Sequence, residues 1–194
     1  MPDDDRPNVL VFMTDQQRFD WTGATSDVPV RTPTLDALAE RGTAFENAVC
    51  PSPLCGPSRA CLATGMEYDR CGVPHHDFVT PTDRPTLYGR LRDGAGYHVL
   101  GVGKFDLQKS PETWGADGKR ILDTYGFSDG VNNAGKWDAV GSATDWDPGS
   151  PEFTGAVDPY MAYLDAEGLA ETHVEDFRRR AAAAPPATFP TPLP

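Results

Sequence analysis

The segment of residues 54–65, Leu-Cys-Gly-Pro-Ser-Arg-Ala-Cys-Leu-Ala-Thr-Gly, contains a thiol and a guanidinium in a pattern typical of a helix start. Pro57 suits the first helical position, where a missing N–H does no harm. Gly65 suits the position at which a helix ends. The segment therefore predicts a helix that begins at Pro57. The residues on its predicted apolar face are Ala60, Leu62 and Ala63.

Cys55 lies two residues before the start of this predicted helix, and Arg59 lies four residues after Cys55. The N–H groups of a helix N-terminus attract anions and can activate a nucleophile. Residues four apart lie on one face of a helix, so the thiol and the guanidinium are expected to face the same space. The segment thus predicts a reactive side chain beside an anion-binding helix end. The alternative is an ordinary helix start with a buried cysteine.

The same segment resembles the sulfatase motif, Cys-x-Pro-Ser-Arg followed by a short run that ends in Thr-Gly. The matching residues are Cys55, Pro57, Ser58, Arg59, Thr64 and Gly65. The resemblance implies that a formylglycine-generating enzyme oxidises Cys55 to formylglycine, whose hydrate is the nucleophile. It also implies that Arg59 stabilises this hydrate.

A hydrated aldehyde has chemistry that an ordinary serine or cysteine lacks. One of its hydroxyls attacks sulfur and gives a sulfated intermediate. The second hydroxyl then loses its proton and expels sulfate by cleavage of a C–O bond. A plain alcohol would instead leave a sulfate ester that water attacks only slowly.

Two oxygen-bearing side chains follow an apolar run near the N-terminus. Residues 8–14, Asn-Val-Leu-Val-Phe-Met-Thr, predict a strand buried on both faces, and Asp15 comes directly after it. Sites in open α/β sheets lie at the carboxyl ends of strands, so Asp15 is placed to be a ligand or a catalytic group. The alternative is an aspartate that caps a helix or forms a turn.

This stretch also resembles the opening of sulfatases, in which Pro-Asn and an apolar run precede Asp-Asp or Asp-Gln. The resemblance implies that Asp15 and Gln16 bind Ca²⁺ together with residue 55, with Mg²⁺ and Mn²⁺ as alternatives. Carboxylate and amide oxygens are ligands that suit Ca²⁺. Gln16 stands where many relatives have aspartate, which points toward the phosphonate monoester hydrolases of the superfamily.

Lys104 is the third candidate site residue. It follows residues 97–103, which predict a strand, and it matches the lysine of a family motif, Gly-Lys-x-His. The resemblance implies that Lys104 binds the sulfate. Asp106 replaces the histidine of this motif, and an ionised carboxylate repels sulfate and cannot donate a hydrogen bond to it. We therefore expect Asp106 either to orient Lys104 or to face away.

The other histidine and cysteine candidates have simpler interpretations. The pair His75 and His76 could contact substrate, but a solvated loop pair is the preferred interpretation. The remaining cysteines match no common zinc spacing, and without an export signal no disulfide framework is expected. They are Cys50, Cys61 and Cys71.

The charge balance disfavours two classes of partner. The 194 residues carry a formal net charge of −12, from 21 Asp, 8 Glu, 13 Arg and 4 Lys. Such acidity disfavours nucleic acid and anionic membranes. An aspartate-rich, lysine-poor composition is typical of salt-loving microbes, so we expect a halophilic protein rather than an ordinary acidic one. The acidic N-terminus has no apolar segment of a secretory signal, which predicts a cytoplasmic location.

Periodicity predicts alternating strands and helices that would position these residues. Helices are expected over 32–42, 86–95 and, in two pieces broken near Gly168, 158–184, with further strands over 43–50 and 119–123. We predict three regions along the chain. They are the N-terminal part of a sulfatase catalytic domain over 1–157, a helical insertion over 158–184, and a proline-rich tail at a truncation point over 185–194.

The resemblance implies an α/β fold, a three-layer α/β/α sandwich around a mixed, mostly parallel sheet of the alkaline-phosphatase type. It implies an arylsulfatase-like hydrolysis of a small-molecule or carbohydrate sulfate ester. The Asp-His-Gly motif that completes the metal site in the family does not occur in the chain. We therefore expect an N-terminal fragment that by itself binds Ca²⁺ weakly and turns over little. Two alternatives stay open, a phosphonate or phosphate ester hydrolase on the same scaffold and an inactive anion-binding module.

Overall fold

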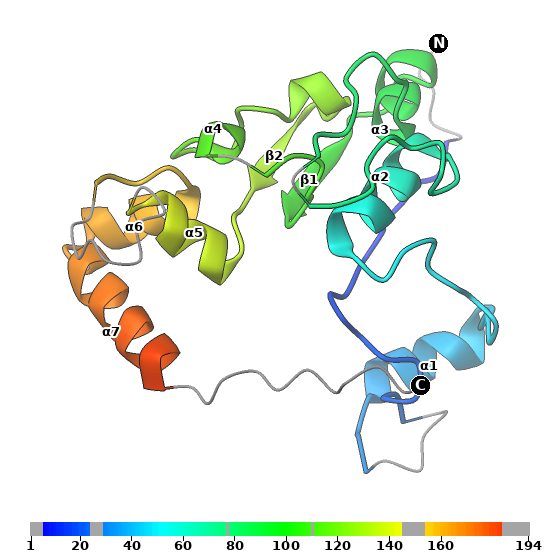
Figure 1. Cartoon of the computed structure of the whole chain (residues 1–194). Coiled ribbons are helices and arrows are strands. Elements are labelled where there is room, and N and C mark those ends of the chain that lie inside the picture. Colours follow the sequence, from blue (N-terminus) through cyan, green and yellow to red (C-terminus); the bar gives the residue numbers. More distant parts are fainter. Residues whose placement is uncertain (1–5, 24–28, 77, 110, 145–153, 184–194) are drawn as a thin grey trace, which may run out of the picture. The chain divides into compact units, whose positions relative to one another are not determined.

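The computed structural model describes residues 6–23, 29–76, 78–109, 111–144 and 154–183. The chain forms two compact units, Met1–Val49 and Cys50–Pro194. Figure 1 labels the helices and strands of both units.

The first unit has a single helix within its described residues, α1 (Pro33–Arg41). This helix confirms the one predicted over 32–42. The hydroxyl of Thr32 accepts a hydrogen bond from the Gly23 N–H at 2.7 Å and donates one to Asp36 at 2.9 Å, which ties the preceding loop to the first turn. Leu38 of this helix remains exposed.

Neither strand predicted around this unit is present among the described residues. Residues 8–14 and 43–50 pair with no other described segment, and Leu10 and Phe12 are 90% and 84% exposed. A strand requires a neighbour that accepts and donates its backbone hydrogen bonds. The predictions of a buried central strand before Asp15 and of a strand leading to Cys55 are therefore wrong for this structure.

The second unit contains a two-stranded parallel sheet, β1 (Leu100–Gly103) and β2 (Asp129–Asn132). β1 confirms the C-terminal part of the strand predicted over 97–103. The strand predicted over 119–123 is wrong, because this stretch forms turns that lead into the 3₁₀ turn η2 (Asp123–Tyr125).

Pairing of the two strands depends on a glycine in β2. Gly130 lies opposite Gly101 and has a φ of 144°, a backbone conformation that side chains rarely adopt. A Cβ atom on Gly130 would also collide with the Gly101 carbonyl oxygen. Glycine at this position therefore allows the close approach of β2 to β1.

The described residues of the second unit also form several short helices (Figure 1). They are α2 (Cys55–Thr64), α3 (Leu87–Gly89) continued by the π-helical turn η1 (Arg90–Gly94), α4 (Pro111–Trp114), α5 (Lys136–Ser142), α6 (Pro159–Ala166) and α7 (Ala170–Ala183). α3 and η1 confirm the helix predicted over 86–95. α6 and α7 confirm the two helical pieces predicted over 158–184, with Gly168 in a left-handed conformation between them.

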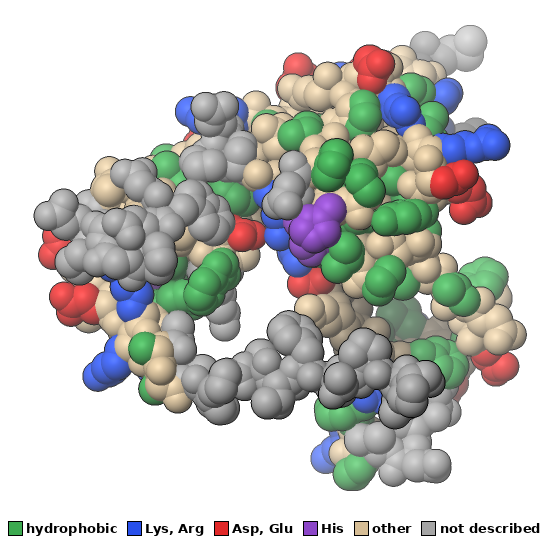
Figure 2. Space-filling model, viewed as in Figure 1, with side chains coloured by type: hydrophobic (Ala, Val, Ile, Leu, Met, Phe, Trp, Pro, Cys, Tyr) green, Lys and Arg blue, Asp and Glu red, His purple; other side chains and the backbone are tan. Residues whose placement is uncertain are grey.

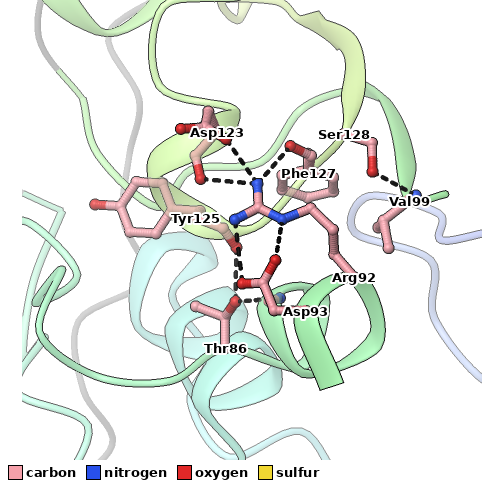
Figure 3. Close-up of polar contacts among 9 residues, drawn as sticks. Thr86, Arg92, Asp93, Val99, Asp123, Tyr125, Phe127 and Ser128 are labelled. Atoms are coloured by element: carbon pink, nitrogen blue, oxygen red, sulfur yellow. Dashed lines mark hydrogen bonds and ion pairs between the residues drawn. The ribbon is translucent and has the colours of Figure 1, made fainter. Parts of the chain in front are cut away.

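A polar network joins the helical segment 87–94 to the chain that enters β2 (Figure 3). The Arg92 guanidinium donates to the side chain of Asp123 at 2.8 Å and to the carbonyl of Phe127 at 3.0 Å. The Thr86 hydroxyl donates to the carbonyl of Tyr125 at 2.6 Å. The ring of Tyr125 is almost fully buried, so this network and the apolar cluster around that ring fix the same segment.

The described residues thus form an α/β arrangement with a small parallel sheet. Residues 185–194, predicted as a proline-rich tail, lie outside the described residues. Across the described ranges, every helix is too short or too polar to cross a lipid bilayer.

Candidate active site around Cys55

Cys55 is the first residue of α2, in the second unit. The Ser58 N–H bonds to the Leu54 carbonyl at 3.0 Å, so the helix begins two residues earlier than predicted. Pro57 consequently lies third rather than first in the helix, still within the first turn, where its missing N–H costs nothing. The Cys55 side chain therefore belongs to the first turn of the helix instead of preceding it.

The predicted buried face and the predicted end of α2 are largely confirmed. Ala60 and Ala63 are fully buried, whereas Leu62 is 43% exposed and does not belong to the buried face. Gly65 ends the helix with a φ of 67°, and its N–H bonds to the Cys61 carbonyl at 2.8 Å. The two small buried side chains let the helix lie close to the rest of the unit and so fix the position of Cys55.

Arg59 and Lys104, which are 45 residues apart, meet at this site. The Arg59 Nη1 atom donates a hydrogen bond of 2.6 Å to the backbone carbonyl of Lys104. Lys104 directly follows β1, so this bond ties the carboxyl end of the strand to the first turns of α2. Two of the three predicted catalytic residues are thereby joined directly, and the third, Cys55, lies one helical turn from Arg59.

Asp106, which we expected either to orient Lys104 or to face away, pairs with it. The Oδ2 atom of Asp106 lies 3.3 Å from the Lys104 ammonium and 3.7 Å from that of Lys109. Its side chain is only 6% exposed, and its φ of 50° lies in the left-handed region that aspartate tolerates better than most residues. The site therefore contains a buried carboxylate between two lysines.

The pKa of the Cys55 thiol is raised above its ordinary value. Burial is the largest cause, followed by a hydrogen bond to Asp106 and by the charge of that carboxylate, while the charges of Lys104 and Lys109 oppose the shift. These causes oppose the activation that we expected from the helix N-terminus. As an unmodified cysteine, residue 55 stays protonated at neutral pH and is a poor nucleophile.

His76 was not selected as a site residue from the sequence, yet it lies beside Cys55. Its Nδ1 atom is 3.5 Å from the Cys55 sulfur. Burial, followed by the charge of Lys109, lowers the pKa of His76, so the imidazole is neutral at pH 7. On the face shown in Figure 2, histidine side chains (purple) adjoin those of lysine and arginine (blue). A loop histidine 21 positions from Cys55 has no spacing that would reveal this contact.

Asp15 and Gln16, the predicted metal ligands, lie in the first unit. Both are exposed and form a bend, and Gln16 has a φ of 59°. A carboxylate and an amide oxygen are donors of the kind that Ca²⁺ takes, but Ca²⁺ needs six to eight oxygens. The described residues contain no group of three or more His, Cys, Asp or Glu side chains that could hold a metal ion. The pair offers donor types that suit Ca²⁺, but too few of them to hold the ion alone.

The other three cysteines lie outside this arrangement. Cys50 is exposed, whereas Cys61 and Cys71 are buried in one small apolar cluster beside α2. Burial, followed by its hydrogen bond to Cys71, raises the pKa of Cys61 to about 11. Both buried thiols therefore act as packing groups.

Comparison with known proteins identifies the family. The family model described as "Sulfatase" matches residues 7–169. The chain therefore belongs to the sulfatase family, whose members have an alkaline-phosphatase-like α/β fold. No solved structure matches the chain.

Three curated relatives illustrate the range of the family. The chain is 37% identical to the uncharacterized sulfatase YidJ of Escherichia coli over 120 residues, which cover 58% of this chain and 24% of that protein. It is 29% identical to the ulvan-active sulfatase of Formosa agariphila over 179 residues, 88% of this chain and 33% of the relative. It is 31% identical to the N-acetylglucosamine-6-O-sulfatase of Bacteroides thetaiotaomicron over 107 residues, 55% of this chain and 19% of the relative. The chain thus spans a fifth to a third of the length of these relatives.

Proposed function

We propose that this protein is a sulfuric ester hydrolase in which residue 55 acts as formylglycine. The observation that carries the proposal is the position of Cys55 in the first turn of α2, beside Arg59 and the Lys104–Asp106 pair. The raised pKa of the thiol supports it, because a protonated cysteine is a poor nucleophile and conversion to an aldehyde hydrate would supply a better one. A formylglycine-generating enzyme is the partner that this conversion requires.

The proposed reaction has two steps. First, one hydroxyl of the hydrated residue 55 loses its proton and attacks sulfur, the S–O bond to the alcohol or phenol breaks, and the departing oxygen takes up a proton. Second, the other hydroxyl loses its proton, a C=O bond re-forms, and the C–O bond to sulfate breaks. The products are the free alcohol, sulfate and the regenerated aldehyde, so no oxidant or reductant is consumed in the cycle.

Arg59 and Lys104 supply positive charge where the reaction develops negative charge. We assign Arg59 to stabilising the hydrate, one turn along α2 from residue 55. We assign Lys104 to binding the sulfate near the leaving oxygen. Fixed cationic donors in a partly buried site stabilise a developing charge more strongly than water does.

Asp15 and Gln16 would hold Ca²⁺, or alternatively Mg²⁺ or Mn²⁺, together with residue 55. When bound, such a cation neutralises charge on the sulfate oxygens as a Lewis acid. The role of these two residues is to orient oxygen donors toward the cation. We also propose that the catalytic domain forms a three-layer α/β/α sandwich. Its N-terminal part would span residues 1–157, and residues 158–184 would form a helical insertion.

The substrates named for the relatives guide the proposed substrate class. Two relatives are named for action on ulvan and on N-acetylglucosamine 6-O-sulfate, which are carbohydrates. We therefore propose a small-molecule or carbohydrate sulfate ester as substrate. We also propose a cytoplasmic location, and separately a saline setting, for which the net charge of −12 is the support.

A phosphonate or phosphodiester hydrolase is the second candidate. Asp106 favours it, because this carboxylate occupies the place of a sulfate-binding histidine and lies in the site. An inactive anion-binding module is the remaining alternative. Parallel rates on sulfate and phosphodiester substrates separate the two enzymes, and absence of turnover on both identifies the module.

Metal removal tests the proposed function. We expect the protein produced by its host to hydrolyse p-nitrophenyl sulfate, to lose at least about 100-fold in rate with EDTA, and to recover with Ca²⁺. We expect the 194 residues alone to bind Ca²⁺ weakly in calorimetry, because the described residues offer only part of a ligand set. Full turnover in the presence of EDTA would contradict the proposed use of a cation.

A further inference from the structure

We infer that Asp106 makes the site around residue 55 selective for esters that carry one negative charge over esters that carry two. This inference rests on the proposed function and adds that the site selects its substrate by the charge of the ester group. It applies equally to sulfate monoesters, phosphodiesters and phosphonate monoesters, each of which carries a single charge. Phosphate monoesters, which carry nearly two charges at pH 8, are the class that the site disfavours.

The first support is the position of the Asp106 carboxylate. Its side chain is 6% exposed, so water screens its charge poorly. The Asp106 carbonyl oxygen lies 3.7 Å from the place that a Cβ atom would take on Gly56, the residue after Cys55, and the Asp106 carboxylate helps to raise the pKa of the Cys55 thiol. An anion bound at residue 55 therefore meets this carboxylate at close range.

The second support is how firmly Asp106 is held. The Lys104 and Lys109 ammonium groups lie 3.3 Å and 3.7 Å from its Oδ2 atom, and Lys109 lies 3.3 Å from Asp138 as well. The Oδ2 atom forms no hydrogen bond of good geometry with any described residue. Its partners are thus charges rather than directional donors, and the two lysines fix the carboxylate within the site.

The third support is the balance of charge among these residues. Arg59, Lys104 and Lys109 contribute three positive charges, and Asp106 and Asp138 contribute two negative charges, which leaves a net charge of +1 for the described cluster. One substrate charge neutralises this cluster, whereas a second charge remains uncompensated beside Asp106. A bound cation would attract a second substrate charge as well, but Asp106 repels a dianion about twice as strongly as a monoanion whether or not the cation is present.

The first test uses the 194-residue chain produced without a formylglycine-generating enzyme. Cys55 is alkylated with iodoacetate, which is negatively charged, and with iodoacetamide, which is neutral, and each rate is measured on peptides by mass spectrometry. Both reagents react with the thiolate, so the ratio of the two rates does not depend on the ionised fraction of the thiol. The ratio therefore reports the charge around Cys55. We expect Asp106→Asn to raise this ratio about tenfold at Cys55 and to leave it unchanged at the exposed Cys50.

Two further variants serve as controls. Asp106→Glu keeps the charge, so the ratio should remain as in the unmodified sequence. Asp117→Asn makes the same chemical change in an exposed turn and should have no effect. Asparagine tolerates a positive φ about as well as aspartate, so Asp106→Asn is expected to fold. An unchanged ratio in folded Asp106→Asn would overturn the inference.

The second test measures ester selectivity in the enzyme with residue 55 converted. At pH 8, Asp106→Asn should raise kcat/KM for phenyl phosphate relative to p-nitrophenyl sulfate about tenfold, and this gain should shrink at pH 5, where phenyl phosphate carries one charge. Hydrolysis of the sulfate ester with unchanged selectivity would overturn the inference and leave the proposed function standing. Absence of all sulfate ester hydrolysis, together with the shifted alkylation ratio, would overturn the proposed function alone.

Discussion

Replacing Cys55 by serine is expected to lower steady-state hydrolysis of p-nitrophenyl sulfate by at least about 1000-fold. Serine offers a single hydroxyl in the first turn of α2. That hydroxyl can accept the sulfuryl group, but it has no second hydroxyl that could expel sulfate by C–O cleavage. The Cys55→Ser enzyme should therefore stop after one attack.

The covalent product distinguishes this arrest from loss of folding. Mass spectrometry of Cys55→Ser after incubation with substrate should show a sulfated serine, about 80 Da heavier, on the peptide that contains residue 55. Cys55→Ala should be equally inactive and should carry no adduct. Cys50→Ser makes the same change at an exposed cysteine and should retain full activity. Steady turnover by Cys55→Ser would contradict the proposed role of residue 55.

Replacing Arg59 by alanine is expected to lower kcat/KM for the same substrate by about 100- to 1000-fold. The loss has two physical causes. The substitution removes a positive charge beside residue 55, and it removes the hydrogen bond that ties α2 to the end of β1. A guanidinium has five N–H donors in one plane, so it can hold the Lys104 carbonyl and still offer donors to an anion.

Arg59→Lys separates these two causes, because it keeps the charge and loses the planar set of donors. We expect this variant to recover no more than about a tenth of the activity, because it keeps the positive charge but loses the hydrogen bond to the Lys104 carbonyl and the further planar donors. Arg90→Ala removes an exposed arginine and should leave kcat/KM unchanged. Wild-type activity in Arg59→Ala would show that Arg59 takes no part in the reaction.

Local helix chemistry could be predicted from the sequence with good accuracy. Gly65 ends α2 and Pro33 begins α1, because each residue has a backbone preference that acts without distant partners. The helical segments over 87–94 and 159–183 follow from apolar spacing and from local breaks such as Gly168. These features depend on neighbours in the sequence, so periodicity detects them.

Strands were predicted less well because they depend on distant partners. The apolar run 8–14 has the composition of a buried strand, but no described segment pairs with it. β2 was missed because its sequence, Asp-Gly-Val-Asn, has little strand propensity. It forms where Gly130 lets the backbone approach Gly101, a contact that spacing along the chain does not reveal.

Only part of the site could be predicted, because some of its residues come from distant segments of the chain. Cys55, Arg59 and Lys104 belong to motifs with fixed spacing, and the structure joins Arg59 to Lys104 directly. His76 and Lys109 reach the site from loops, whose paths depend on packing rather than on sequence spacing. The effect of the Asp106 carboxylate on the pKa of the Cys55 thiol likewise emerges only when the chain is folded.

The mass of residue 55 in the protein produced by its host is the most direct test of the proposed chemistry. Trypsin releases residues 42–59 as one peptide, which also contains Cys50, so fragmentation must assign any change to one of the two positions. We predict that residue 55 is about 18 Da lighter than cysteine, as conversion of a thiol to an aldehyde requires, while Cys50 keeps its mass. An unmodified thiol at position 55 in that protein would contradict the proposed function.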